Sequence, residues 1–560
     1  MADAAAAPQP QMKASLGLTG VTMNAMALIA PGAFLWITFA VQAGYVFPSG
    51  LSMWFGILVA LVLAYATAVS YAELAKLYPG AGSSYLFAEQ AFLGKTRASR
   101  FARIAKFIIG WSSHLYYWVY PAVMVAMMGV MLGYIWGTLA PTFMNAGTPG
   151  PVFMALVAIV FSFFVCWIAY RGVTSSTRVN VAINVIQIIA LLFFAALAIS
   201  FRLSHPEGSA GLTYDASGGV VATTLHYTLS DTLNVSHPSA LSVIAPHRFD
   251  WMMLQATVAI LLLVGFESVT ALGEEAKDPK RDIPRGVLLS LTIQGLVCYM
   301  IEYFAANYFM SSGYSLGAAK SSAAPVGDMM VLVGNAMLGG RGRAFMLIEA
   351  FTVFLALIGT TLSCINTGAR VTYAMGRDKE VPEHFGLLHG KNLTPHRAIW
   401  TLGIIAAVLG AYGALYYFAG GSAPDAPTIK GLPTNIWYAI GMSSHDALAR
   451  LPNGLLLITL VSNFGTFVLY GLTNIVCIVA FKEHHMFNGF KHMVVPIFGA
   501  FANFACLAFY IIGPIEGLGS AKEPLMAVGL AAVWGVYGVI YFMRSSKKHG
   551  KDILMKPAAA

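Results

Sequence analysis

Residues 261–286 read LLLVGFESVTALGEEAKDPKRDIPRG, and this stretch decides the fold. An apolar run carries Gly265 and Glu267 through its middle and then changes abruptly into a dense tail of mixed charge. Glycine weakens a helix, and a charged side chain at the centre of a bilayer costs about 2.5–3.5 kcal/mol on insertion scales. A chain that keeps both residues inside an apolar segment is expected to interrupt its helix there.

The whole chain is far less charged than a water-soluble protein. Its 560 residues are 58% hydrophobic and 10% charged, with a mean hydropathy of +0.70. Soluble domains carry about 25% charged residues. A deficit of this size over the full length predicts a polytopic membrane protein.

The five cysteines all lie in apolar runs without a CxxC pair, which predicts buried thiols and no disulfide framework. No cleavable signal peptide is expected, because the polar N-terminus has no charged segment that leads into an apolar core.

Twelve apolar runs, numbered here as spans 1 to 12, are long enough to cross a bilayer, which needs about 20 helical residues. Helices are predicted because the bilayer core offers no water to the unpaired edge of a strand. The expected spans cover residues 17–45, 51–75, 105–136, 151–170, 178–201, 251–273, 286–310, 344–373, 398–419, 451–481, 493–515 and 524–543.

Basic residues predict the orientation. With the N-terminus inside, 25 of the 33 lysines and arginines lie in or beside the inner loops, as the positive-inside rule requires. The net charge of +9 is therefore expected to face anionic lipid of the cell membrane, and no nucleic-acid partner is predicted. The expected divisions are inner tails at 1–16 and 544–560, helix blocks at 17–201, 251–483 and 493–543, and outer loops at 202–250, 311–343 and 420–450.

Two spans carry interruptions near their centres. In span 1, Pro31 lacks an amide hydrogen and Gly32 lacks a Cβ, so the helical ladder is expected to open there. In span 6, Gly265 and Glu267 stand at a similar depth. These spans begin two five-helix blocks of opposite orientation, a pattern typical of secondary transporters with a binding site at the bilayer midplane. Freed amides can hold an anionic group there and freed carbonyls a cation. A proline kink that binds nothing is the alternative.

Four sequence blocks resemble the amino acid–polyamine–organocation (APC) superfamily. The segment GFESVTALGEEAKDPKRDIPRG (265–286) is similar to its span-6 signature. The other three are YAELAKLYPGAGSSYLFAEQAFLG (71–94), RGVTSSTRVNVAINVIQ (171–187) and NTGARVTYAMGRDKEVPEHFG (366–386), and all four occur in the family's order.

The resemblance implies an all-α membrane protein of twelve helices. It further implies a leucine-transporter-like 5+5 inverted repeat with broken spans 1 and 6, and alternating access. In the family, a substrate carboxylate meets amides at the span-1 break, and its ammonium meets carbonyls at both breaks. Carried over, with Glu267 added, the substrate-binding positions are Ala30, Pro31, Gly32, Ala33, Val264, Gly265, Phe266 and Glu267.

The sequence departs from the family pattern at two positions. Ala30–Gly32 replaces the usual Gly-small-Gly, so that one amide is missing from the carboxylate cradle. Gln187 occupies the place where some proton-coupled relatives carry a lysine, and a glutamine side chain cannot titrate.

Several polar residues inside the spans are candidates for ion coupling. Glu267 has three interpretations, which are a tie to the unwound backbone, a proton carrier and a direct contact with a substrate amine. Glu302 is a second intramembrane acid, whereas Glu349 is expected to be solvated at the interface. Hydroxyls of span 8 could complete a sodium site with span-1 carbonyls, or could bond only to their own helix. These hydroxyls belong to Thr360, Thr361 and Ser363.

Span 3 has an aromatic stretch, WSSHLYYWVY, in which His114 is expected to be a hydrogen-bonded histidine of the bundle. Trp111, Tyr116, Tyr117 and Trp118 could line an ammonium site by cation–π contact, but helical spacing favours packing. The tail after span 6 is expected to place Pro284 in the first turn of span 7 and to pair with the basic loop after span 2 as an inner gate. A solvated connector is the alternative.

The sequence as a whole predicts a plasma-membrane permease for an amino acid or related amine. Uptake is expected to be proton-driven, with sodium coupling or exchange as alternatives, and no cofactor or metal is predicted. The main rival is a polyamine carrier, which would need several convergent acids. A membrane-bound enzyme and a channel are less favoured, since no pair of catalytic residues is recognisable by spacing.

Overall fold

The computed structural model describes residues 14–45, 49–80, 82–92, 99–143, 151–204, 211–214, 220–223, 240–310, 316–417, 452–482, 486–515 and 522–549. The outer loop expected at 420–450 lies outside the described residues, as do large parts of the loop at 202–250 and of both tails.

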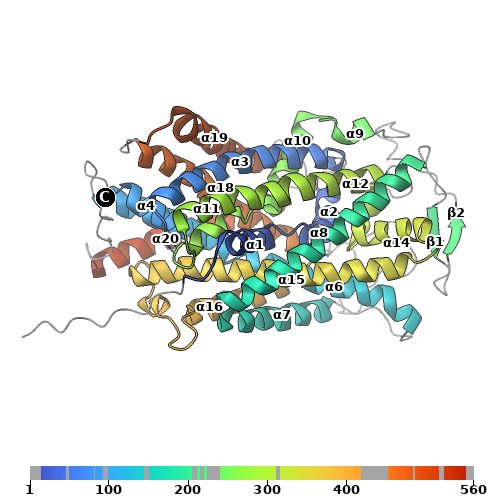
Figure 1. Ribbon diagram of the computed structural model, residues 1–560, viewed down its shortest axis with the longest axis horizontal. Coiled ribbons are helices and arrows are strands. Elements are labelled where there is room, and N and C mark those ends of the chain that lie inside the picture. Colours follow the sequence, from blue (N-terminus) through green and yellow to red (C-terminus); the bar gives the residue numbers. More distant parts are fainter. Residues whose placement is uncertain are drawn as a thin grey trace, which may run out of the picture.

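The protein is a bundle of helices, and twelve helical segments within the described residues are long and apolar enough to cross a membrane. Their long axes run broadly along the length of the molecule (Figure 1). Spans 1 to 6 are α1 (Leu18–Ile29) with α2 (Pro31–Gly44), α3 (Met53–Leu77), α5 (Ser99–Tyr117) with α6 (Tyr120–Phe143), α7 (Pro151–Arg171), α8 (Val173–Ser204), and α10 (Phe249–Leu263) with the 3-10 segment η2 (Phe266–Leu272). Spans 7 to 12 are α11 (Pro279–Leu291) with the π-helical η3 (Thr292–Tyr299) and α12 (Met300–Met310), α15 (Gly342–Arg377), α16 (His396–Leu415), α18 (Gly454–Phe481), η6 (Phe490–Val494) with α19 (Val495–Ile515), and α20 (Lys522–His549).

Short elements connect the spans. They are η1 (Ser49–Ser52), α4 (Ser84–Phe92), α9 (Ala240–Ile244), α13 (Leu316–Ser321), α14 (Pro325–Met337) and η4 (Glu383–Gly386). Two strands, β1 (Gly211–Tyr214) and β2 (Val220–Thr223), form an antiparallel hairpin in the loop between spans 5 and 6. The hairpin and α4 lie at opposite ends of the molecule (Figure 1). The all-α prediction is confirmed for the spans, and this hairpin is a small addition to it.

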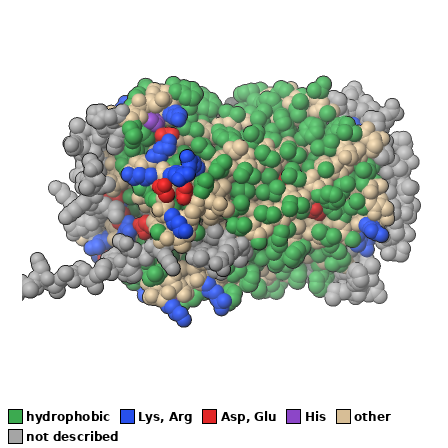
Figure 2. Space-filling view, in the orientation of Figure 1, with side chains coloured by type: hydrophobic (Ala, Val, Ile, Leu, Met, Phe, Trp, Pro, Cys, Tyr) green, Lys and Arg blue, Asp and Glu red, His purple; other side chains and the backbone are tan. Residues whose placement is uncertain are grey.

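The surface of the bundle suits a lipid environment. Figure 2 shows a broad hydrophobic surface, with Lys, Arg, Asp and Glu side chains gathered near one end, called the charged end below. The outermost helices expose large apolar side chains, such as Phe501 of α19 and Val533 of α20. All five cysteines are buried and free, as predicted. The chain is therefore a multi-pass membrane protein.

Spans 7, 3 and 12 show how the helices differ from their predicted form. Span 7 begins at Pro279, so that Pro284 lies inside the helix and not in its first turn. Pro279 occupies the first position of this helix instead, and there the N–H that a proline lacks would have no intrahelical partner. Span 3 is interrupted at Trp118 and Val119, just before Pro121, which cannot donate to the preceding turn. Span 12 continues to His549, beyond its predicted end at 543.

Candidate functional site

The break in span 1 follows from Pro31. Helix α1 ends at Ile29, Ala30 has φ 22° and ψ 80°, and α2 starts with Pro31 at its first position. Because Pro31 has no N–H, the carbonyl of Ala27 four residues earlier loses its helical partner. Ala33 N instead donates to Ala30 O at 3.1 Å. The interruption that the sequence predicted over Ala30–Ala33 is therefore present.

Side chains of spans 7 and 8 reach the carbonyls at the end of α1. Thr360 Oγ1 lies 2.8 Å from Ala27 O, the carbonyl that Pro31 leaves free, and also 2.8 Å from Ala356 O of its own helix, so the two carbonyls share its single proton. Tyr299 OH donates to Ile29 O at 2.8 Å, and Gln294 Nε2 donates to Met26 O at 3.2 Å. This end of α1, where the helix dipole is negative, is thus held by neutral donors from two other spans.

The break in span 6 depends on Gly265. Helix α10 ends at Leu263, Val264 is extended, and Gly265 has φ +126° before the chain continues as the 3-10 segment η2. A Cβ on Gly265 would lie 2.8 Å from Leu28 Cγ and 3.1 Å from Ile29 N. The two breaks therefore touch, and only a glycine fits both the dihedral angle and the space.

Glu267 closes the span-6 break with its side chain. The carboxylate is fully buried and accepts three hydrogen bonds, from Gly265 N (2.9 Å) and Tyr470 OH (2.6 Å) at Oε2 and from Tyr117 OH (3.0 Å) at Oε1. These donors replace water around a buried charge. The contacts are those expected of a tie to the unwound backbone, while the roles of proton carrier and amine contact stay predictions.

Aromatic rings surround the junction of the two breaks. Phe266 packs against Tyr470 with ring centroids 5.3 Å apart, and Tyr71 of α3 lies 6.0 Å from Phe266. Phe34 of α2 lies 6.0 Å from Tyr120 of α6, whose hydroxyl donates to Leu261 O at 3.2 Å. The walls around the breaks are thus apolar faces with hydroxyl groups at their edges.

Of the three span-8 hydroxyls, only Thr360 reaches span 1. Thr361 Oγ1 donates to Leu357 O of its own helix at 2.7 Å, which is the purely local role. Ser363 Oγ accepts from Asn180 Nδ2 of span 5 at 3.0 Å. The structure therefore brings one of the three candidates to the span-1 break.

The two other intramembrane acids are both buried. Within the described residues, neither carboxylate oxygen of Glu302 has a hydrogen-bond partner. Glu302 follows Tyr299 by three residues, so it lies about 4.5 Å further along the helix axis from the level of the break. Glu349 is only 2% exposed, so the predicted solvated position was wrong. Span 8 packs Glu349 inside the bundle, although it lies near the end of that helix.

Gln187 lies beside the span-1 break. Its Nε2 donates to Asn184 Oδ1 at 3.0 Å, and its Oε1 would be 3.1 Å from a Cβ on Gly32. Asn184 also accepts from Gln294 Nε2 and donates to Met23 O. A network of buried amides therefore occupies the place that the family resemblance assigns to a lysine.

The aromatic stretch of span 3 divides into two roles. Trp111 Nε1 donates to Trp534 O of α20, and His114 stacks on Trp118 with centroids 4.5 Å apart. His114 Nε2 lies 3.4 Å from Thr372 Oγ1, so His114 is a bundle histidine with a hydroxyl neighbour, as expected. Tyr117 alone of this stretch contacts Glu267.

The acids after span 6 pair with the end of span 8. Arg370 donates to Glu275 at 2.8 Å, and Arg377 lies 3.6 Å from Glu274. The predicted partner, the basic loop after span 2, was therefore wrong for these two acids. The described bases of that region pair elsewhere, and they are Lys76 with Glu73, Arg103 with Glu380, and Lys106 with Glu89 and Asp378. Helix α15 reaches the charged end and places its arginines closer to this tail.

Sequence reasoning missed several residues that hold the breaks. Tyr470, Tyr299 and Gln294 each lie in an apolar run, and nothing in their spacing indicates a partner. The only available signal was that a buried hydroxyl or amide in a span must find a hydrogen bond.

The fold and the two touching breaks define a polytopic membrane protein whose interrupted helices meet inside the bundle. The sequence model of the family described as amino acid permease matches residues 15–537. The chain belongs to this family, and the APC resemblance is thereby confirmed.

Relatives of this chain include transporters for different small molecules. The branched-chain amino acid permease BcaP of Bacillus subtilis is 26% identical over 98% of this chain and 96% of its own length. The low-affinity putrescine importer PlaP of Escherichia coli is 25% identical over 71% of this chain and 74% of its own length. The methylthioribose transporter of Bacillus subtilis is 26% identical over 62% of this chain and 64% of its own length. The relatives are named for transport, which points to a transport role.

Proposed function

We propose that this protein is a secondary active transporter that moves an amino acid across the cell membrane by alternating access around the breaks in spans 1 and 6. The contact between Gly265 and the end of α1 carries the proposal, because it places main-chain groups of both breaks in one region. Amides at the start of α2 would meet the substrate carboxylate, and carbonyls near Leu263 and Val264 its ammonium. The blocks 17–201 and 251–483 would form the inverted repeat that rocks about this site.

An amino acid suits this site better than a polyamine. A diamine has two ammonium groups and needs at least two convergent acids. Glu267 already accepts three hydrogen bonds, and the second intramembrane acid, Glu302, lies about 4.5 Å further along its helix from the level of the break. Two of the relatives, from Bacillus subtilis and Lactococcus lactis, are named as branched-chain amino acid permeases, which supports the same choice. An apolar amino acid such as leucine is therefore the substrate class we favour.

Proton coupling is the proposed driving force. Glu267 and Glu302 are buried carboxyl groups inside the spans, and a buried carboxyl can exchange a proton when water reaches it. The contact between Thr360 and Ala27 O keeps sodium coupling as the alternative. Exchange of one amino acid or amine for another needs no external ion and is the second alternative. Both termini are proposed to be cytoplasmic because of the distribution of basic residues.

Uptake of radiolabelled leucine into proteoliposomes tests the proposal. We expect saturable uptake that requires an inward proton gradient and is competed by apolar amino acids. Competition by putrescine and by no α-amino acid would favour the polyamine carrier instead. If uptake depends on a sodium gradient, sodium symport would replace proton coupling in the proposal. If uptake occurs only into liposomes preloaded with substrate, the protein would be an exchanger. A flux that does not saturate would indicate a channel.

A further inference from the structure

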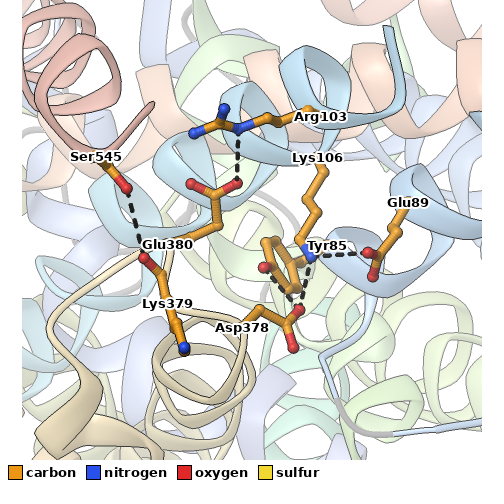
Figure 3. A network of polar contacts seen from close by, with 8 residues as sticks. All are labelled: Tyr85, Glu89, Arg103, Lys106, Asp378, Lys379, Glu380 and Ser545. Atoms are coloured by element: carbon orange, nitrogen blue, oxygen red, sulfur yellow. Dashed lines mark hydrogen bonds and ion pairs between the residues drawn. The ribbon is translucent and has the colours of Figure 1, made fainter. Parts of the chain in front are cut away.

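A cluster of buried charges at the charged end lies outside the proposed substrate site. It joins the short helix α4, span 3 and the segment that follows span 8 (Figure 3). Lys106 of α5 is fully buried and lies 2.8 Å from Glu89 of α4 and 2.7 Å from Asp378. Tyr85 of α4 also donates to Asp378, at 2.9 Å. Lys106 therefore forms ion pairs with both α4 and the segment that follows span 8.

Glu380 is the weakly satisfied member of this cluster. Its side chain is fully buried, and within the described residues neither of its oxygens has a hydrogen-bond partner. The nearest base is Arg103, whose Nε lies 4.0 Å from Glu380 Oε1 and whose guanidinium also faces the ring of Phe542. A buried carboxylate so poorly paired is costly when it is ionised.

The charges around Glu380 nearly cancel only when it is protonated. The titratable groups that face it are Arg103 and Lys106 from α5, Glu89 and Tyr85 from α4, Asp378 from its own segment, and Tyr541 from α20. A third base, Arg377, lies 3.8 Å from Asp378 Oδ1, but it is partly exposed and lies 3.6 Å from Glu274 as well. Apart from this Arg377–Glu274 pair, two bases stand against the two acids Glu89 and Asp378, so an ionised Glu380 is a third, unmatched negative charge. Burial raises the pKa of Glu380 to about 7, and the neighbouring bases only partly oppose this effect.

Helix α4 links this cluster to the break in span 6. Ser83, just before α4, lies with its hydroxyl 2.6 Å from Thr270 Oγ1 in η2, and Thr270 in turn donates to Glu267 O. Ser84 of α4 lies 3.0 Å from Thr473 of span 10. A change in the packing of α4 at Glu89 is therefore positioned to affect η2, the segment that would move in the proposed alternating access.

We propose that Glu380 is a proton-operated latch, which when protonated lets α4, α5 and the end of span 8 pack together, and which when ionised adds an unmatched negative charge that loosens this packing. The inference rests on the proposed function, since a latch regulates transport only in a transporter. The packed state is favoured while Glu380 holds its proton, and this advantage is lost as the pH rises through about 7.

Hydrogen exchange of the substrate-free full-length protein in detergent tests the latch. The amides of residues 82–92 and 378–386 are followed at pH 6 and pH 8, after correction for the intrinsic pH dependence of exchange. If the loosened state restores an ordinary carboxyl group, exchange in the wild type should rise about tenfold between these values. Glu380→Gln should show a change of less than about twofold, because its side chain cannot ionise. The matched control is Glu383→Gln, since Glu383 is exposed nearby and the variant should behave like the wild type.

Equal changes in the wild type and in Glu380→Gln would overturn the latch. A second variant, Arg103→Leu, removes the base that favours ionised Glu380 and should move the midpoint of the change to higher pH; an unmoved midpoint would count equally against it. These measurements need no transport. If hydrogen exchange follows the prediction but no leucine uptake is found, the proposed function is rejected and the pH-sensitive contact at Glu380 is still supported.

Discussion

Tyr470 donates a 2.6 Å hydrogen bond to Glu267 Oε2, across 203 residues of sequence. The same oxygen accepts from Gly265 N, so that a side chain of span 10 and the main chain of span 6 share one carboxylate oxygen. Tyr117 of span 3 bonds the other oxygen. Glu267 thus connects three spans at the point where one of them loses its helical hydrogen bonds.

Replacing Glu267 with glutamine should test which role this side chain has. Folding should survive, because the amide keeps the shape and one acceptor oxygen, although one tyrosine must reorient to accept from the new NH₂ group. If Glu267 carries the proton, the pH dependence of leucine uptake should flatten in Glu267→Gln. Uptake is measured between pH 5 and 8 in proteoliposomes. An unaltered pH profile would remove Glu267 as the carrier and leave only its structural role.

Tyr470→Phe should separate the structural role from the proton. It removes one of the three donors and keeps the carboxyl group. A hydrogen bond to a charged group contributes about 1.5–3 kcal/mol, so the free energy of unfolding should fall by an amount in this range, which thermal unfolding detects as a lower Tm. The control is Tyr510→Phe, because the hydroxyl of Tyr510 is buried without a hydrogen-bond partner among the described residues. Equal losses in the two variants would contradict a special bond to Glu267.

Gly265→Ala should be among the most damaging small substitutions in the chain. Its φ of +126° is strained for any L side chain, at about 1–3 kcal/mol, and the added methyl group would meet Leu28 and the main chain of Ile29. We expect loss of thermal stability and of uptake together. Gly529→Ala is the matched control, because a Cβ at Gly529 meets nothing within 4 Å. A Gly265→Ala protein with the stability of this control would show that the breaks do not touch as described.

The sequence predicted the spans and breaks because both depend on local chemistry. Hydropathy over about 20 residues identifies a span, and Pro31 and Gly265 with Glu267 mark in the sequence where the helices are interrupted. The partners of the breaks could not be predicted in this way. Tyr299 and Tyr470 lie in apolar runs, and their bonds to Ile29 O and Glu267 depend on how distant helices pack. The pairing of Glu275 with Arg370 escaped prediction for the same reason.

Thr360 and Thr361 should differ in their effects although they are neighbours. Thr360→Val removes two contacts of Thr360 Oγ1, one to Ala356 O of its own helix and one to Ala27 O, which Pro31 has already deprived of its helical donor. If Thr360 and Ala27 O hold the coupling ion or the substrate together, loss of a contact worth about 1–3 kcal/mol should lower uptake by about tenfold, and any stimulation by sodium should disappear. Thr361→Val removes only a bond to its own helix and should change uptake less than about twofold. Initial rates with sodium and with choline measure both effects, and equal losses would place Thr360 outside the site.

Lys106→Met should destabilise the charged end strongly. The change leaves Glu89 and Asp378 near each other without their shared base, and removal of one member of a buried ion pair costs about 3–5 kcal/mol. The double variant Lys106→Met/Glu89→Met should recover part of this loss, since it also removes one of the two acids that pair with Lys106. Lys76→Met is the control, because Lys76 is 44% exposed in its pair with Glu73 and should contribute no more than about 1 kcal/mol. Thermal unfolding at pH 6 compares the three variants, and a Lys106→Met protein as stable as Lys76→Met would show that the cluster does not hold α4.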